Sequence, residues 1–132
     1  MNLWRNNWRN QYLNLRLNSS VKIYWKSKGM PNLYIIAGCN GAGKTTASYT
    51  ILPEMLNCKE LVNADSIAAG LSPFKPESVA FEAGRIMLNR IHQLINEKAD
   101  FGFETTLAAK SYISLIRIAR KSGYEITFSI FG

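Results

Sequence analysis

From residue 30 onward, short runs of apolar residues alternate with longer segments whose apolar residues recur at every third or fourth position. The short runs are bounded by Gly, Asn, Asp or Pro, which is typical of buried strands, and the longer segments have the period of core-facing helices. The pattern predicts four strands, over 33–38, 60–65, 100–106 and 124–131, and three helices, over 44–56, 77–98 and 109–122.

This alternation of strand and helix is typical of an α/β fold in which parallel strands are joined by right-handed crossovers. Pro53 is expected to interrupt the first helix and Gly123 to end the last one. Ser66 is expected to cap a short turn over 66–70. The second helix should turn one apolar stripe toward the core, made of Val79, Ala83, Ile86, Met87, Ile91, Leu94 and Ile95.

The first 29 residues differ in composition from the rest of the chain. They hold all three tryptophans and six of the 16 basic residues, but none of the nine acidic ones. We therefore divide the chain into a basic Trp/Asn-rich leader over 1–29, expected to be poorly ordered, and one domain over 30–132. Trp4, Trp8 and Tyr12 would share one face of a helix, so an arm for RNA or anionic lipid is the alternative to a simple appendage.

The domain itself carries ten basic and nine acidic residues, so its charge does not favour a nucleic-acid partner. Cys39 and Cys58 form no spaced disulfide or metal-ligand framework, which favours a reducing compartment. No apolar run is long enough for a membrane span, and the N-terminus lacks the hydrophobic block of a signal peptide. We expect a cytoplasmic protein without a membrane partner.

The loop after the first strand carries the strongest chemical signal. Gly38, Gly43, Lys44 and Thr45 match G-x-x-x-x-G-K-[ST] between a predicted strand and a predicted helix, which is the context of a phosphate-binding loop. Glycines let backbone N–H groups turn toward phosphate oxygens, the lysine reaches the β- and γ-phosphates, and the threonine hydroxyl holds Mg²⁺. We expect ATP to be bound by Gly38, Asn40, Gly41, Ala42, Gly43, Lys44, Thr45 and Thr46, with Thr45 as the metal ligand.

Polar residues also end the next two predicted strands. Asp65 closes the second strand, and Glu104, Thr105 and Thr106 close the third. Open parallel sheets bind ligands at the carboxyl edge of their strands, where a carboxylate can accept the proton of an attacking hydroxyl or hold water on a metal. A purely structural role remains the alternative, as a helix cap for Asp65 and as a strand-end residue for Thr105.

Four segments, "PNLYIIAGCNGAGKTT", "VNADSIAAGLSPF", "AFEAGRIML" and "FGFETTLA", together resemble the zeta-toxin family of P-loop kinases, over about residues 30–128. The resemblance implies a P-loop NTPase-type three-layer sandwich with a mostly parallel sheet. It also implies an ATP-dependent kinase that phosphorylates a nucleotide sugar such as UDP-N-acetylglucosamine, with an antitoxin protein as a partner that blocks the nucleotide site.

Carried over by motif, the resemblance implies that Lys44 is the phosphate lysine and Asp65 the general base toward the sugar hydroxyl. Glu104 and Thr106 would bind the UDP-sugar. Arg85 would line the same cleft, or else pair with Glu82 on the helix surface.

Family members continue beyond the fourth strand with an arginine-bearing segment and another strand, so we expect the C-terminal strand and lid to be missing and the kinase domain to be incomplete. Ile126, Phe128 and Ile130 would then be poorly covered. The alternatives to an active kinase are a catalytically dead remnant that only binds nucleotide and a nucleic-acid or membrane-associated protein that acts through its leader.

Overall fold

The computed structural model describes residues 29–39, 43–106 and 111–131. The predicted leader lies almost wholly outside these residues. The described strands form one sheet in the order β2-β3-β1-β4, and every neighbouring pair is parallel. Their bounds are Asn32–Gly38 for β1, Leu61–Val62 for β2, Phe101–Thr105 for β3 and Glu125–Phe131 for β4. The α/β class predicted from the sequence is confirmed.

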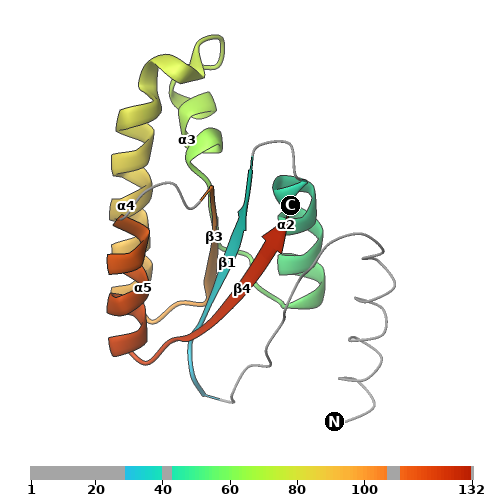
Figure 1. Cartoon of the computed structure of the whole chain (residues 1–132), viewed down its shortest axis with the longest axis vertical. Helices are drawn as coiled ribbons and strands as arrows, with labels where there is room; N and C mark the ends of the chain where they lie inside the picture. Colours follow the sequence, from blue (N-terminus) through green and yellow to red (C-terminus); the bar gives the residue numbers. More distant parts are fainter. Residues whose placement is uncertain (1–28, 40–42, 107–110, 132) are drawn as a thin grey trace.

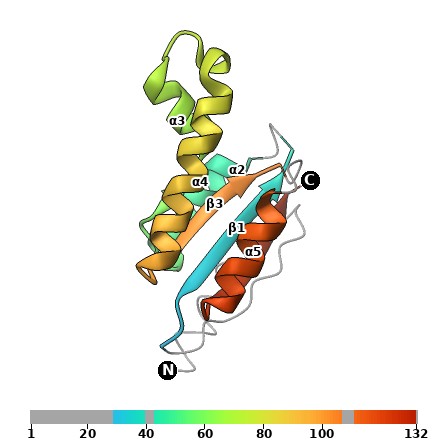
Figure 2. The same cartoon turned by 90° about the vertical axis from the view of Figure 1, so that its left-hand side faces the viewer.

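Helices cover both faces of this sheet. Figures 1 and 2 show α4 and α5 against one face and α2 against the other, so the domain has three layers, whereas α3 and the start of α4 extend beyond the carboxyl ends of the strands. No described helix combines the length and the apolarity that crossing a lipid bilayer requires. The helices span Lys44–Thr50 (α2), Ala64–Leu71 (α3), Ala80–Asn96 (α4) and Ser111–Lys121 (α5), with a π-helix, η1, over Ile51–Met55 and a 3₁₀ helix, η2, over Pro76–Val79.

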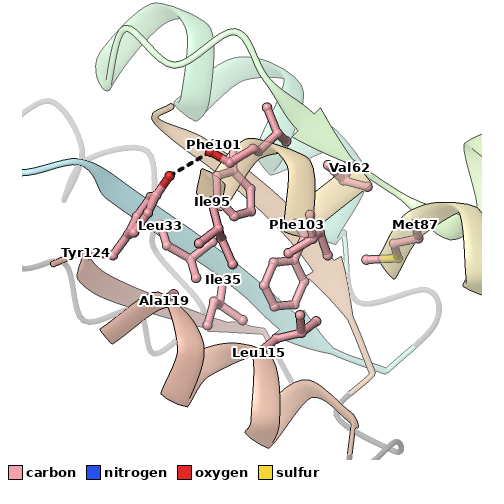
Figure 3. Close-up of a cluster of buried hydrophobic side chains, with 12 residues drawn as sticks. Leu33, Ile35, Val62, Met87, Ile95, Phe101, Phe103, Leu115, Ala119 and Tyr124 are labelled. Atoms are coloured by element: carbon pink, nitrogen blue, oxygen red, sulfur yellow. Dashed lines mark hydrogen bonds between the residues drawn. The ribbon is translucent and has the colours of Figure 1, made fainter. Parts of the chain in front are cut away.

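The central strand β1 is covered on both faces, which explains the unbroken apolar run in its sequence. Leu33 and Ile35 belong to the core between the sheet and the pair α4 and α5 (Figure 3), whereas Tyr34 and Ile36 pack on the other face with Leu52 of η1. Successive strand residues point to opposite faces, so a strand covered on both sides needs apolar residues at every position. The main core contains Leu33, Ile35, Val62, Met87, Ile91, Leu94, Ile95, Phe101, Phe103, Leu115, Ala119 and Tyr124.

The segment 60–65 differs from its prediction. Only Leu61–Val62 pairs as a strand, and Ala64–Leu71 is a helix that contains Asp65 in its first turn. Asn63, and not Ser66, is the N-cap, because its Oδ1 accepts hydrogen bonds from the backbone N–H groups of Asp65 at 2.8 Å and Ser66 at 3.3 Å. Asp65 therefore lies in the first turn of α3, and not at the end of a strand as the sequence predicted.

Two helix predictions need smaller corrections. The first predicted helix changes at Ile51 to a π-helix that contains Pro53, which lacks the N–H that an α-helical bond requires. The second begins as a 3₁₀ helix at Pro76 and is α-helical only from Ala80. Ile86, predicted to face the core, is 38% exposed, although most of the predicted stripe is buried. Gly123 ends α5 with φ of +89°, as predicted.

Strand β4 lies at one edge of the described sheet, beside β1 only. Ile130 is 53% exposed, as expected for a strand without an outer neighbour. Ile126 and Phe128 are partly buried and pack against the main core, so the expectation of poor cover is wrong for these two residues. The core that they pack against includes Leu115 and Ala119 of α5.

Candidate functional site

The parallel register gathers three chain segments at the carboxyl edge of the sheet. In β1 and β3, Ile36 is opposite Glu104 and Ala37 is opposite Thr105. In β2 and β3, Val62 is opposite Phe103, which brings Asn63 beside Glu104. The glycine loop, the start of α3 and the end of β3 therefore meet at the edge where open parallel sheets bind ligands.

The lysine of the glycine loop is turned back onto that loop. Lys44 is only 8% exposed, and its Nζ donates hydrogen bonds to the carbonyl oxygens of Gly38 at 2.6 Å and Cys39 at 3.0 Å. Gly43, which precedes it, has φ of +87°, a conformation that side chains disfavour. Asn40, Gly41 and Ala42, three of the predicted phosphate ligands, lie outside the described residues. Within the described residues, Lys44 is thus held by dipolar carbonyls, which a phosphate can replace.

Glu104 connects the loop to the start of α3. Its Oε2 accepts hydrogen bonds from Thr45 Oγ1 at 3.1 Å and from Asn63 Nδ2 at 2.7 Å. Its other carboxylate oxygen, Oε1, is buried and has no hydrogen-bond partner among the described residues. A buried carboxylate oxygen without a donor is costly, so this atom is suited to a ligand that carries positive charge.

A pocket of about 190 Å³ is lined by Lys44, Asn63 and Glu104, among other residues. It brings together four of the predicted site residues, Lys44, Asp65, Glu104 and Thr106. Arg85 is exposed on α4 and does not line this pocket, and no ion pair with Glu82 occurs among the described residues. Thr46 is exposed on α2. The lining consists of Lys44, Asn63, Ala64, Asp65, Glu104, Thr105, Thr106 and Tyr112.

Two polar lining residues, Asn63 and Tyr112, had no predicted role. Asn63 is buried between β2 and α3, and its strong preference for N-cap positions is the signal that would have identified it. Tyr112 of α5 stacks on Phe103 with ring centroids 5.4 Å apart, and its hydroxyl donates to Met87 Sδ at 3.7 Å. No local signal identifies Tyr112, because only the packing of α5 on β3 brings it to the pocket.

Thr45 does not line the pocket, but its hydroxyl contacts Glu104, which does. Together these two residues fit a hard divalent cation whose other ligands come from phosphate. Glu104 Oε1 and the Thr45 hydroxyl are oxygen ligands of the kind that Mg²⁺ prefers. The described residues contain no group of three or more His, Cys, Asp or Glu side chains that could hold a metal by themselves. A cation here would therefore take its remaining ligands from phosphate oxygens and water, which is the usual situation for Mg²⁺.

A larger hollow of about 560 Å³ lies at the other end of the sheet, beside Met30, Lys98 and Asp100. It is formed at the edge where the strands begin. Its lining contains neither Lys44 nor the carboxylates at the carboxyl ends of the strands. The chemistry therefore favours the smaller pocket at the carboxyl edge.

A protein-family model described as zeta toxin matches residues 17–130. The chain belongs to the zeta toxin family. The match begins inside the segment that the sequence predicts as a leader. An uncharacterized protein of Haemophilus influenzae is 26% identical over 95 residues, which are 72% of this chain and 66% of that protein.

Two solved structures have a similar fold. A chain from the PezAT chromosomal toxin–antitoxin system of Streptococcus pneumoniae superposes with a TM-score of 0.66 and 17% identity, over 96% of this chain. A protein of Chloroflexus aurantiacus described as a kinase superposes with a TM-score of 0.61 and 14% identity, over 77% of this chain. This zeta-toxin chain spans 54% and 59% of those two proteins.

Proposed function

We propose that this zeta-toxin chain is the nucleotide-binding part of an ATP-dependent kinase that transfers the γ-phosphate to a hydroxyl of a nucleotide sugar such as UDP-N-acetylglucosamine. One observation carries the proposal: Lys44 of the glycine loop lines the same pocket as Asp65 and Glu104. Phosphoryl transfer to a hydroxyl requires a positively charged group that binds phosphate and a carboxylate that accepts the hydroxyl proton. The Lys44 ammonium and the Asp65 carboxylate are these two groups, and they line one pocket.

On the nucleotide side, the glycine loop and Lys44 bind the triphosphate. Lys44 Nζ, which donates to the carbonyls of Gly38 and Cys39, would exchange these acceptors for phosphate oxygens. Thr45 and Glu104 hold Mg²⁺. When bound, Mg²⁺ neutralises charge on the transferring phosphate.

On the acceptor side, Asp65 is the general base. It is exposed in the first turn of α3 and lines the pocket, so an acceptor hydroxyl can reach it. As the hydroxyl oxygen forms a bond to the γ-phosphorus, the bond from this phosphorus to the β,γ-bridging oxygen breaks. The hydroxyl proton passes to Asp65, and ADP leaves. Thr106, at the pocket rim, binds the nucleotide sugar.

Glu104 was predicted from the family resemblance to bind the UDP-sugar. Its two hydrogen bonds join it to Thr45 and to Asn63, and its free Oε1 remains. These contacts support a role toward the metal, because the Thr45 hydroxyl that donates to Glu104 is itself the predicted Mg²⁺ ligand. Because Oε2 is already hydrogen-bonded, Glu104 could contact the sugar as well as the metal only through Oε1.

Titration of Mg²⁺·ATP into the purified chain tests the nucleotide site. We expect saturable binding that Lys44→Ala weakens by about 10- to 100-fold, the range for a lost hydrogen bond to a charged group. Lys59→Ala is the matched control, because Lys59 is exposed and lies outside the pocket. Equal binding by the wild type and Lys44→Ala would contradict the phosphate-loop assignment.

Incubation with ³²P-labelled ATP and UDP-N-acetylglucosamine tests transfer. Labelled sugar nucleotide is the expected product, and an excess of other nucleotide sugars as competitors ranks the acceptors. Binding of Mg²⁺·ATP without transfer to any acceptor would instead support the alternative in which this chain is a remnant that only binds nucleotide.

A protein antitoxin that covers the nucleotide pocket, and a cytoplasmic location, complete the proposal. The support for the antitoxin is the likeness to a chain of the PezAT toxin–antitoxin system. A chain bound by such a partner is expected to lose Mg²⁺·ATP binding in the titration described above.

A further inference from the structure

Asn63 lies between the metal side and the acceptor side of the pocket. It is 8% exposed and directly precedes α3, and both ends of its side-chain amide form hydrogen bonds. Oδ1 accepts from the N–H groups of Asp65 and Ser66, and Nδ2 donates to Glu104 Oε2 at 2.7 Å. One buried amide thereby contacts the segment of the proposed base and the carboxylate of the proposed metal site.

Only one orientation of this amide satisfies its surroundings. The backbone N–H groups of Asp65 and Ser66 can only donate, so they require Oδ1. The ionised carboxylate of Glu104 can only accept, so it requires Nδ2. Aspartate and serine at this position would retain an acceptor for the helix cap, but neither side chain supplies an amide donor at Nδ2. Among the strong N-cap residues, asparagine alone carries its acceptor and its donor on separate atoms, which lets it serve the helix start and Glu104 at once.

The donor end determines how Glu104 presents its oxygens. Asn63 and Thr45 both donate to Oε2, so this oxygen is directed toward the loop and α3, and Oε1 is left without a donor. The Thr45 proton is also engaged in that bond, which leaves the lone pairs of its hydroxyl oxygen available to a cation. Without Asn63, Thr45 would be the one described residue that donates a hydrogen bond to the Glu104 carboxylate, which could then rotate about its terminal torsion.

The acceptor end determines where Asp65 lies. The cap satisfies two of the N–H groups that every helix start leaves without an intrahelical partner. Because one of them belongs to Asp65 itself, the cap fixes the backbone from which the proposed base projects. The positions of the two carboxylates are thus coupled through one side chain.

We infer that Asn63 is a positioning residue of the phosphoryl-transfer site, which holds Glu104 in its metal-binding orientation and Asp65 at the acceptor side. The inference rests on the proposed function. It makes a specific demand: loss of the Nδ2 donor must weaken the metal-dependent part of nucleotide binding without disturbing α3.

The test uses Asn63→Ser, which keeps a cap acceptor but removes the amide donor at Nδ2, and Asn63→Asp, which has no donor and also places a like charge against Glu104. Asn89→Ser is the matched control, because Asn89 is exposed on α4. ATP affinity is measured by calorimetry in Mg²⁺ and again in EDTA, and amide hydrogen exchange of residues 64–71 reports on α3.

We expect Asn63→Ser to reduce the Mg²⁺-dependent gain in ATP affinity by about 3- to 10-fold, in keeping with loss of one hydrogen bond to a charged group that acts through a neighbour. Asn63→Asp should reduce it further. ATP affinity in EDTA and exchange across α3 should match the wild type in Asn63→Ser, and Asn89→Ser should match it in every measurement.

A wild type that does not bind Mg²⁺·ATP would overturn the proposed function and this inference with it. If the wild type binds Mg²⁺·ATP and Asn63→Ser shows the same Mg²⁺-dependent gain in ATP affinity, the inference alone would be overturned. The same conclusion would follow from a variant whose ATP affinity falls equally in Mg²⁺ and EDTA while α3 loses protection, since this would show a helix cap without a role in positioning Glu104.

Discussion

The hydroxyl of Thr45 donates a hydrogen bond to Oε2 of Glu104 across 59 positions of sequence, with the two oxygens 3.1 Å apart. Thr45 belongs to the second position of α2, and Glu104 is the fourth residue of β3. The bond fixes the direction of the hydroxyl proton, so the oxygen lone pairs face away from Glu104. In the proposed kinase this relationship prepares Thr45 as a metal ligand before Mg²⁺ arrives.

Replacing Thr45 by valine tests this preparation. Thr45→Val removes the hydroxyl at nearly constant volume, and we expect the Mg²⁺-dependent gain in ATP affinity to fall by about 10- to 100-fold. Thr45→Ser, which keeps the hydroxyl, should retain most of the gain. Calorimetric titrations with and without EDTA measure the effect. Thr50→Val, at the exposed end of α2, is the control, and an equal loss in this control would contradict the assignment.

Replacing Asp65 by asparagine separates chemistry from binding. The α3 cap uses the backbone N–H of Asp65 and not its side chain, so the fold should be unaffected. We expect phosphoryl transfer to fall by about 10²- to 10⁴-fold, which is the usual contribution of a general base, with unchanged affinity for Mg²⁺·ATP. Glu77→Gln, an exposed acid in η2, is the matched control. Transfer at the wild-type rate by Asp65→Asn would exclude Asp65 as the base.

Gly102 is a test of packing beneath the site. A Cβ at this position would lie 2.8 Å from Leu52 Cδ1 and 3.2 Å from the carbonyl oxygen of Tyr34. Gly102→Ala should therefore lower the free energy of unfolding by about 1 to 3 kcal/mol, through overpacking between β3 and η1. Gly84→Ala in α4 meets no atom within 4 Å and should stabilise by up to about 1 kcal/mol. Urea unfolding measures both, and a stabilised Gly102→Ala would contradict the packing described here.

The buried hydroxyl of Tyr124 should make the free energy of unfolding fall at alkaline pH. Burial raises the pKa of its hydroxyl to about 12, with smaller contributions from the charges of Asp100 and Glu97. The neutral hydroxyl shares its one proton between the carbonyl oxygens of Leu94 at 3.0 Å and Ala99 at 2.7 Å. The pKa of an unfolded tyrosine is about 10, so the stabilisation is fully present below pH 10 and is lost as the pH rises toward 12.

The variant Tyr124→Phe should accordingly lower the free energy of unfolding by about 1 to 2 kcal/mol at neutral pH. Between pH 10 and 12, the free energy of unfolding should decrease less steeply with pH in this variant than in the wild type. Part of the fall should remain, because burial also raises the pKa of Tyr34. Tyr49→Phe is the control, since Tyr49 is exposed on α2. Denaturation measured at a series of pH values checks the result, and an unchanged alkaline slope in Tyr124→Phe would contradict it.

The sequence pattern succeeded where the determining interactions are local. The apolar run before Gly38 and the position of Gly123 depend on residues within a few positions of each other, and both predictions are confirmed. The cap of α3 was missed because the stretch from Asn63 to Ser66 holds three residues that can cap a helix. Burial of Asn63 against Glu104 selects among them, and this contact is 41 residues away in sequence.

The pocket shows the same division. Lys44 and Thr45 were predicted as site residues from one contiguous motif, and Asp65 and Glu104 from their places at predicted strand ends. Of these four, Lys44, Asp65 and Glu104 line the pocket. The direction of the Lys44 ammonium toward Gly38 and Cys39 could not be predicted, because a flexible lysine takes the acceptors that the folded loop offers. Tyr112 was missed because helical periodicity predicts a buried face without showing what that face meets.

By itself, the sequence determined the alternation of strands and helices and the presence of a glycine loop with its lysine and threonine, because these features depend on spacing within single segments. Only the tertiary structure decided that Glu104 would contact both Thr45 and Asn63. The physical reason is register: parallel strands joined by helices can pair at several offsets, and packing across the whole sheet selects the one that aligns Ile36 with Glu104.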